Sequence, residues 1–265
     1  MNEHEQPTPV TGTIKDTAKC PTFTLCAFTW NEIESIRVIM PQVDRSLFEQ
    51  ILIVDANSTD GTAEWCREQG YEVFSQTSNG LRQAYQEVLP HVRGDYMIAF
   101  SPDGNSLADK LPGLVEKLKE GYDMVVVSRY LGPAKSADDD WLTGFGNWMF
   151  TRIVNILHGG KYTDVMVMYR GFRTNLMREL RLDKWDDPAI KWPARIFSAT
   201  MGIEPLMSAR AARAGCRTAE IPGDEPPRIG GERKLKIFRW GMAILTQFIL
   251  EWFLPRSRYR RQEQT

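Results

Sequence analysis

The segment Met97–Ser106, with the sequence MIAFSPDGNS, begins as an apolar strand and ends in oxygen-bearing side chains. Ser101, Asp103 and Asn105 stand at alternate positions directly after the apolar run. A plain turn needs only Pro and Gly there, whereas a metal site at a strand end needs oxygen ligands at such a spacing. The other strand ends decide between the two readings.

Five short apolar segments, each closed by polar residues, have the pattern of β-strands: 22–28, 50–55, 71–76, 96–100 and 123–128. The segments between them space their apolar residues as amphipathic helices do: 62–70, 81–92 and 106–121. Strands that alternate with helices predict an α/β fold, in which helices cover both faces of a mostly parallel, Rossmann-like sheet.

Polar segments follow all five predicted strands: FTWNE, DANSTDGT, SNGLRQA, SPDGNS and SRY. In open α/β sheets, ligands bind outside the carboxyl ends of the strands. Each segment alone also fits a turn or a helix cap. Five of them at one edge of one sheet favour a binding site there.

Composition excludes several other functions. The net charge of −1 argues against nucleic acid as the main partner, because binding to its phosphates needs clustered positive charge. Four cysteines without CxxC spacing and only three histidines give no zinc or redox motif. Residues 1–20 are polar, so we expect a disordered leader without a signal peptide and a cytoplasmic protein.

The chain after residue 128 changes its pattern. We expect a helix over 144–160, an extended and partly buried segment over 163–173, and another helix over 195–215. This half is expected to close over the sheet edge and to supply the side of the site that binds the second substrate.

The ordered set of NE, DANSTDGT, NGLRQA, SPDGNS, SRY, TDVMVMYRGFR and RIGGERKL resembles family 2 inverting glycosyltransferases of the GT-A fold, most closely their polyprenyl-phosphate branch. The resemblance covers about residues 22–240. It implies a GT-A domain over 21–230, a nucleotide-diphosphate sugar as donor, Mg²⁺ or Mn²⁺ as cofactor, and a polyprenyl phosphate or related lipid phosphate as acceptor.

On the donor side, the resemblance places Asn31, Glu32 and Asp55 near the nucleoside of the activated sugar. A carboxylate there can accept hydrogen bonds from a base or a ribose. Gly80 and Ala84 stand in the position of a glycine-rich family motif, which lets the backbone approach the donor.

The resemblance assigns Asp103 and Asn105 to the metal ion. Ser101 stands where the family usually has a first carboxylate. Mg²⁺ is often bound by only one or two protein carboxylates together with waters and phosphate oxygens. We therefore expect a metal site that is weak until the donor is bound.

The resemblance places Asp164 near the reacting centre and Arg129 and Arg170 around the phosphates, where guanidinium groups fit well. Asp103, Asp164 and Arg170 are the expected catalytic residues. The resemblance also places a basic glycine-rich loop over the donor and the acceptor, so Arg228 and Lys234 in this loop are expected to contact phosphates.

Three functions stay open from the sequence. A phosphate acceptor is ionised near neutral pH and needs no strong base. A hydroxyl acceptor on a glycan, a lipid or a small metabolite would need one, and Asp164 is the candidate. A nucleotide-sugar binding protein without turnover is the third reading, because Ser101 replaces a carboxylate.

Residues 231–265 are expected to form an acceptor-side loop, an amphipathic helix and a basic tail. The helix, over 235–254, carries the polar residues Lys236, Arg239, Gln247 and Glu251 and is too interrupted to span a bilayer. It either lies in a membrane interface or packs on the domain or on a dimer partner. A membrane acceptor would then be reached at the membrane surface or through a membrane protein partner.

Overall fold

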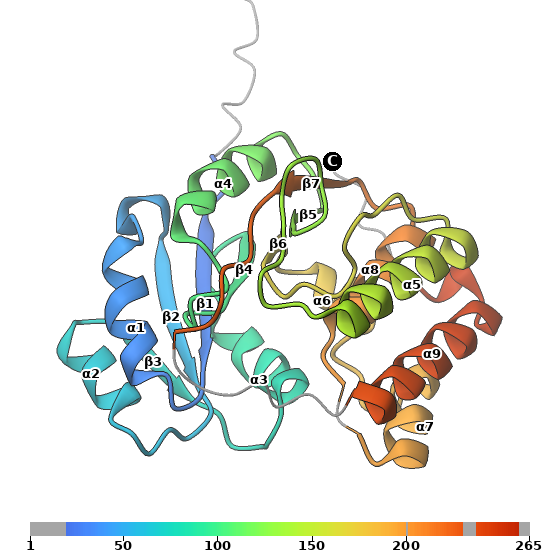
Figure 1. Cartoon of the computed structure of the whole chain (residues 1–265), viewed down its shortest axis with the longest axis horizontal. Coiled ribbons are helices and arrows are strands. Elements are labelled where there is room, and N and C mark those ends of the chain that lie inside the picture. The colour runs from blue at the N-terminus through green and yellow to red at the C-terminus, as the bar shows by residue number, and fades with distance from the viewer. Residues whose placement is uncertain (1–19, 200, 230–236, 260–265) are drawn as a thin grey trace, which may run out of the picture.

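The computed structural model describes residues 20–199, 201–229 and 237–259. Within these ranges seven strands form one sheet in the order β3-β2-β1-β4-β6-β5-β7 (Figure 1). The strands are β1 (Phe23–Thr29), β2 (Gln50–Asp55), β3 (Glu72–Ser75), β4 (Tyr96–Phe100), β5 (Met124–Ser128), β6 (Arg170–Arg173) and β7 (Thr218–Pro222). β6 is antiparallel to β4 and β5, and the other neighbouring pairs are parallel. The five predicted strands and the mostly parallel sheet are confirmed.

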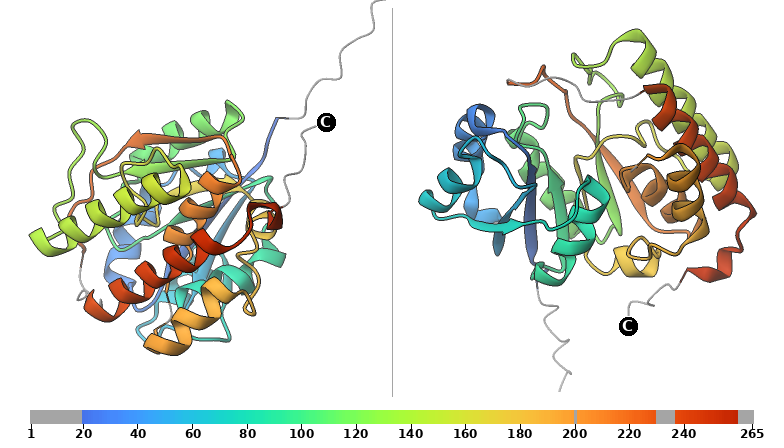
Figure 2. Two further views of the ribbon diagram at one scale, coloured as in Figure 1. Left: turned by 90° about the vertical axis from the view of Figure 1, so that its right-hand side faces the viewer. Right: turned by 90° about the horizontal axis from the view of Figure 1, so that it is seen from below.

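Helices cover both faces of the sheet, as Figure 2 shows from two further sides. One face packs against α1 (Ile33–Ile39), α2 (Thr62–Glu68) and α4 (Leu111–Lys119). The other packs against α3 (Leu81–Val88), α5 (Trp141–His158), α6 (Leu176–Glu179), α7 (Pro188–Phe197), α8 (Glu204–Arg213) and α9 (Ile237–Phe253). Short 3-10 turns lie at Met40–Gln42, Arg45–Leu47, Leu89–His91, Ala108–Lys110 and Arg256–Arg258, the last of which is η5.

The central strands are apolar on both sides because each side meets a helical layer. Leu25 and Ile98 lie in the core under α1 and α4, whereas their chain neighbours Cys26 and Met97 lie in the core under α3 and α8. Successive side chains of a strand point to opposite faces, so a strand buried on both faces is a continuous apolar run. This explains why the runs predicted from the sequence hold no alternation of polar residues.

The prediction of one helix over 195–215 is wrong. α7 ends at Phe197, where Ser198 adopts a left-handed conformation with φ of 43°. α8 begins only at Glu204, with Pro205 in its first turn. A left-handed residue stops a helix, and proline is tolerated only at a helix start, so these two residues separate the helices.

The predicted C-terminal helix is present as α9, which packs against α5, α7 and α8. Two residues of its polar stripe face inward: Gln247 donates a hydrogen bond to the Ala189 carbonyl at 3.0 Å, and Glu251 pairs with Arg210 at 2.9 Å. Apolar side chains face outward instead, with Phe238 81% exposed. Across the described ranges, no helix combines the length and the apolar content that crossing a membrane requires.

Two glycines test how tightly the two layers close on the sheet. A Cβ atom on Gly171 in β6 would clash with Leu118 of α4 and lie 3.2 Å from Ile98. A Cβ atom on Gly146 in α5 would meet nothing within 4 Å. We therefore predict that Gly171→Ala lowers the free energy of unfolding by about 1–3 kcal/mol. Gly146→Ala is expected to raise it by up to about 1 kcal/mol, because alanine favours a helix.

Urea unfolding of both variants beside the parent protein measures the two changes. The tight closure of α4 over β6 would be contradicted if Gly171→Ala were as stable as the parent protein.

Candidate active site

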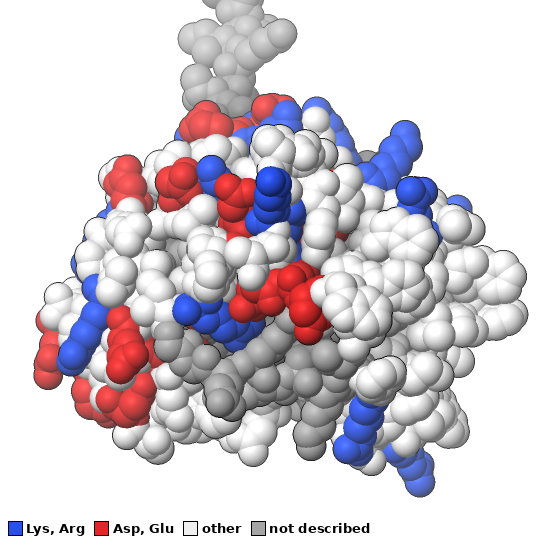
Figure 3. All heavy atoms as spheres, in the orientation of Figure 1, with Lys and Arg blue, Asp and Glu red and all other residues white. Residues whose placement is uncertain are grey.

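The sheet topology brings the expected site residues to one edge. Asp55 is the last residue of β2, and Asn31 and Asp103 follow the carboxyl ends of β1 and β4; the three strands are neighbours in the order β2, β1, β4. Arg170 begins the antiparallel strand β6 and so lies at the same edge, and Arg129 follows β5. Figure 3 shows acidic and basic side chains gathered in the middle of the face that carries these loops.

Asn31 and Asp55 lie in two loops that bind each other. Asn31 has φ of 55°, its N–H donates to Ser58 Oγ at 2.9 Å, and its Oδ1 accepts from the Thr59 N–H at 2.8 Å. Asp55 Oδ2 accepts from the Ser58 N–H at 3.0 Å. Asp55 Oδ1 is buried and has no hydrogen-bond partner among the described residues. Because such atoms are nearly always paired, this oxygen is suited to accept a ligand N–H or O–H.

Glu32 fixes the start of α1. Its N–H donates to Thr62 Oγ1 at 3.0 Å, and its Oε2 accepts from Ser35 Oγ at 3.1 Å. Asp60 accepts from the Ile33 and Thr62 N–H groups, both at 3.0 Å. Burial would raise the pKa of Asp60, but the hydrogen bonds from Thr62 and Ile33 lower it below its ordinary value. Glu32 and Asp60 therefore hold the two nucleoside-side loops together.

Gly80 and Ala84 have different places. Gly80 lies at the start of α3 with φ of 112°, a conformation that suits glycine. Ala84 is 2% exposed and packs in the core, so its small side chain serves helix packing. Between them, Arg82 is buried and donates to the Met201 and Gly202 carbonyls at 3.3 and 2.9 Å. This arginine ties α3 to the segment before α8.

Asp103 and Asn105 lie beside two further charged residues. The Asn105 N–H donates to Asp103 Oδ1 at 3.0 Å, and Asn105 Nδ2 donates to Asp138 Oδ2 at 3.3 Å. The Arg228 guanidinium lies between the two carboxylates, 3.7 Å from Asp103 and 3.5 Å from Asp138. Asn105 Oδ1 is buried without a partner among the described residues. We call these four residues the Asp103 group.

The segment that carries Arg228 approaches the Asp103 turn closely. The Ile229 N–H donates to the Asp103 carbonyl at 2.8 Å. Gly104 has φ of 98°, and a Cβ atom on it would lie 2.9 Å from Ile229 Cγ1. Both the backbone conformation and the close approach therefore require glycine at this position.

Arg129 and Asp164 form a buried ion pair. Arg129 Nε lies 2.6 Å from Asp164 Oδ2, and its Nη2 lies 3.1 Å from Oδ1. Arg129 Nη1 lies 3.0 Å from Glu225 and 3.6 Å from Asp139. Burial would raise the pKa of Asp164, but the Arg129 charge and backbone hydrogen bonds lower it below its ordinary value. The carboxylate is therefore held ionised, with both oxygens occupied.

Protein oxygen atoms surround the guanidinium groups of Arg129 and Arg170. Arg129 is occupied by Asp164 and Glu225. Arg170 is fully buried, and its guanidinium donates to the carbonyls of Val165, Val167 and Glu204 and to Ser208 Oγ. Burial lowers the pKa of Arg170. These contacts hold the start of β6 against α8 and the segment before β6. The catalytic role expected of Arg170 stays a prediction.

Three acidic residues of the site were not predicted from the sequence: Asp138, Asp139 and Glu225. The first two belong to the run DDD at 138–140, which is the signal that could have found them. They connect the Asp103 group to the Arg129–Asp164 pair. Lys234, the other expected phosphate contact, lies outside the described residues.

The residues of the Asp103 group fit a divalent cation only in part. Within the described part of the chain, no three His, Cys, Asp or Glu side chains are arranged to hold a metal ion by themselves. The unpaired Asn105 Oδ1 and the Asp103 carboxylate offer oxygen ligands. This fits an ion such as Mg²⁺ that takes most of its ligands from waters and substrate phosphates.

Comparisons with known proteins identify the family. The model of the family described as glycosyl transferase family 2 matches residues 27–181, more than half of the chain. Glycosyltransferase AglJ of Haloferax volcanii is 29% identical over 204 residues, covering 77% of this chain and 62% of that protein. Undecaprenyl-phosphate mannosyltransferase of Micrococcus luteus is 28% identical over 235 residues, covering 81% of this chain and 92% of that protein. The chain thus spans less than two thirds of the length of AglJ.

Solved structures share the fold. Mannosyl-3-phosphoglycerate synthase from Rubrobacter xylanophilus superimposes with a TM-score of 0.63 at 17% identity, covering 91% of this chain and 77% of that one. Glucosyl-3-phosphoglycerate synthase from Mycobacterium tuberculosis, solved with Mn²⁺, UDP-glucose and phosphoglyceric acid, gives 0.61 at 16% identity, covering 89% and 81%. The fold and the family match confirm the resemblance seen in the sequence, and the chain belongs to glycosyl transferase family 2.

Proposed function

We propose that this protein is a metal-dependent inverting glycosyltransferase that moves a sugar from a nucleotide-diphosphate sugar to a polyprenyl phosphate or a related lipid phosphate. The observation that carries the proposal is the row of sites along one sheet edge, from the unpaired Asp55 oxygen through the Asp103 group to Asp164. The undecaprenyl-phosphate mannosyltransferase of Micrococcus luteus supports the acceptor class.

The row of sites from Asp55 to Asp164 is long enough to hold an extended ligand. β2 and β5 lie four strand spacings apart in the sheet. At about 4.8 Å for each spacing, Asp55 and Arg129 stand about 19 Å apart along the edge. The nucleoside end of a donor would meet Asn31 and Asp55, and its diphosphate would lie at the Asp103 group.

The Asp103 group suits a departing diphosphate. Asp103 and Asn105 would hold Mg²⁺ or Mn²⁺, and such an ion neutralises the negative charge that develops on the leaving group. Asp138 lies beside them and adds a second carboxylate. Arg228, 34% exposed, is the cation of this group and would bind phosphate oxygens directly.

The state of Asp164 favours a phosphate acceptor over a hydroxyl. A general base must be able to take a proton in the substrate complex. Asp164 is fully buried, is paired with Arg129, and has a lowered pKa. A phosphate oxygen needs no such base, because it is already ionised near neutral pH.

We also propose that the protein meets its acceptor at a membrane surface. α5 and α9 pack together and expose bulky apolar side chains: Trp141, Phe145, Trp148, Ile156, Phe238, Met242, Ile249, Trp252 and Phe253. Across α5, α7 and α9, all within the described ranges, the one acidic residue is the buried Glu251. Exposed cations lie on the same helices, among them Arg152 and Arg195.

That combination fits an anionic bilayer. In Figure 3 the side of the molecule formed by these helices is white and blue without red. Exposed aromatic side chains enter the interfacial region of a bilayer, and nearby cations are attracted to anionic lipids.

Asp103→Asn tests the metal-dependent step. We predict that the parent protein slowly hydrolyses one nucleotide sugar with Mn²⁺, and that the variant loses about 100-fold or more of this activity, because the carboxylate that would hold the metal is gone. Asp109→Asn, at an exposed residue just beyond the same turn, is the matched control and should keep full activity. Binding of nucleotide sugars without cleavage by the parent protein would favour the non-catalytic reading.

The acceptor class is tested by comparing undecaprenyl phosphate with undecaprenol, which differ only in the phosphate. We predict transfer to the phosphate alone, because Asp164 is not available as a base. Mass spectrometry of the lipid product measures it. Transfer to the alcohol, or to phosphoglycerate in place of either lipid, would contradict the proposed acceptor.

Membrane binding is tested with Phe253→Glu, which places a charge on the exposed face of α9. Partitioning onto vesicles that contain phosphatidylglycerol should fall by about tenfold or more, because a buried Phe contributes roughly 1.5–3 kcal/mol. Val38→Glu, at an exposed apolar residue on α1, should bind as the parent protein does. A variant that changes only the oligomeric state would show that a second copy covers this face.

A further inference from the structure

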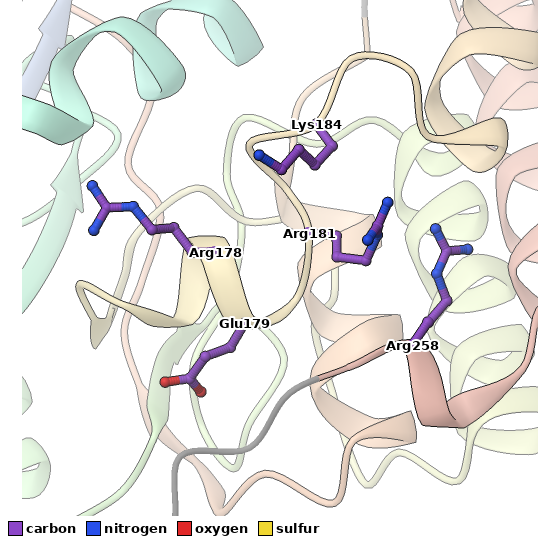
Figure 4. A pocket seen from close by; sticks show the side chains of 5 residues that line it. All are labelled: Arg178, Glu179, Arg181, Lys184 and Arg258. Atoms are coloured by element: carbon purple, nitrogen blue, oxygen red, sulfur yellow. The ribbon is translucent and has the colours of Figure 1, made fainter.

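A basic pocket lies at the other end of the sheet from the candidate active site. Its volume is about 280 Å³, and it is lined by Arg178, Glu179, Arg181, Lys184 and Arg258 (Figure 4). α6, which supplies the first two, follows β6, whose last residue Arg173 pairs with Tyr96 at the start of β4. The pocket therefore lies at the edge where the parallel strands begin.

The charges beneath the pocket do not balance. The buried Asp187 carboxylate meets three guanidinium groups, those of Arg181, Arg210 and Arg258. Glu251 meets Arg210 and Arg213. Four guanidinium groups thus share two carboxylates. Three of these guanidinium groups are largely buried, and the fourth, that of Arg181, is 40% exposed. Unbalanced buried charge is unfavourable, so a further anion at the open side would stabilise this cluster.

The acidic residue in the pocket wall does not supply that anion. Both oxygens of Glu179 accept from the Arg173 guanidinium, at 2.9 and 2.8 Å. Among the described residues, Lys184 pairs with its half-buried neighbour Asp183, at 3.3 Å. The positive charge of Arg181 and Arg258 therefore faces the pocket.

One N–H donor at the pocket has no partner: among the described residues, Arg258 Nη1 is buried without a hydrogen bond. Arg181 Nε makes no hydrogen bond to them either, and its one ion-pair contact, with Asp187, is long at 3.6 Å. Figure 4 shows the tips of these two side chains next to each other, whereas the Arg178 guanidinium points away from them. Burial, together with the nearby Arg210 charge, lowers the pKa of Arg258 despite the opposing effect of Asp187. An anion between the two tips would satisfy Arg258 Nη1 and would also meet the Arg181 guanidinium.

The backbone at Arg181 holds its side chain at this place. Arg181 has φ of 55°, in the left-handed conformation that ends α6. Glycine is the usual residue there, and another residue costs about 1 kcal/mol. Strain of this kind is commonly kept where a side chain has a function.

We propose that the basic pocket binds a phosphate group. Guanidinium groups donate paired hydrogen bonds to phosphate oxygens, and a water occupies about 30 Å³, so the pocket has room for a phosphate with part of its hydration shell. The phosphate comes either from a lipid headgroup or from a free phosphorylated solute. This site is independent of the proposed transfer reaction and would exist in an inactive protein.

The test compares the full chain with Arg181→Gln and with the matched control Arg178→Gln, whose parent side chain points away from the pocket. Thermal shift and calorimetric titration with inorganic phosphate and pyrophosphate, at constant ionic strength, measure the free anion. Vesicles of phosphatidylcholine, with and without phosphatidylglycerol, measure the headgroup. We expect Arg181→Gln to weaken binding by about tenfold or more, since a hydrogen bond to a charged group is lost, and Arg178→Gln to change it little.

If Arg181→Gln loses binding only to soluble phosphate, the pocket binds a phosphorylated solute. If the variant loses binding only to anionic vesicles, the pocket binds a lipid headgroup. Equal binding by Arg181→Gln and the parent protein in both assays overturns the proposal. If Arg181→Gln fails to fold, Lys184→Gln, at an exposed residue of the same wall, takes its place in both assays. Equal binding by Lys184→Gln and the parent protein would then overturn the proposal. Neither assay depends on sugar transfer, so a failed transferase assay leaves this result unaffected.

Discussion

The buried pair of Arg129 and Asp164 is the interaction on which the site depends. It joins the end of β5 to the extended segment before β6, and Glu225 adds the segment after β7. Removing one partner of such a pair strands the other charge in the core, at a cost of about 3–5 kcal/mol. One guanidinium group therefore holds together the loop after β5, the segment before β6 and the segment after β7, and it sets the geometry of that half of the carboxyl edge.

The same pair decides how charge is distributed over the site. Arg129 is surrounded by Asp164, Glu225 and Asp139, so it adds no free positive charge to the edge. Positive charge for a diphosphate has to come from elsewhere, and Arg228 is the cation that the described residues place beside Asp103. In the proposed reaction, Arg129 is thus neutralised by the acidic residues around it, and Arg228, on a neighbouring segment, would meet the diphosphate of the donor.

The sequence predicted which strand ends form the site better than it predicted the side-chain contacts within the site. Apolar runs and strand-end polar residues were enough to place Asn31, Asp55 and Asp103 at one edge, because strand direction alone determines where a parallel strand ends. The burial of Arg170 was not predictable in the same way. Its partners Glu204 and Ser208 come from α8, far along the chain, and an arginine that binds phosphate looks the same in sequence as one that binds carbonyl groups.

The inward polar residues of α9 have a consequence for how that helix is oriented. Apolar residues lie on both of its sides, with Ala243 and Phe248 inside and Phe238 and Phe253 outside. Hydrophobic burial alone would therefore discriminate poorly between rotations of the helix about its own axis. The directional contact of Glu251 with Arg210 selects one rotation, and it thereby determines which apolar residues the protein shows to its surroundings.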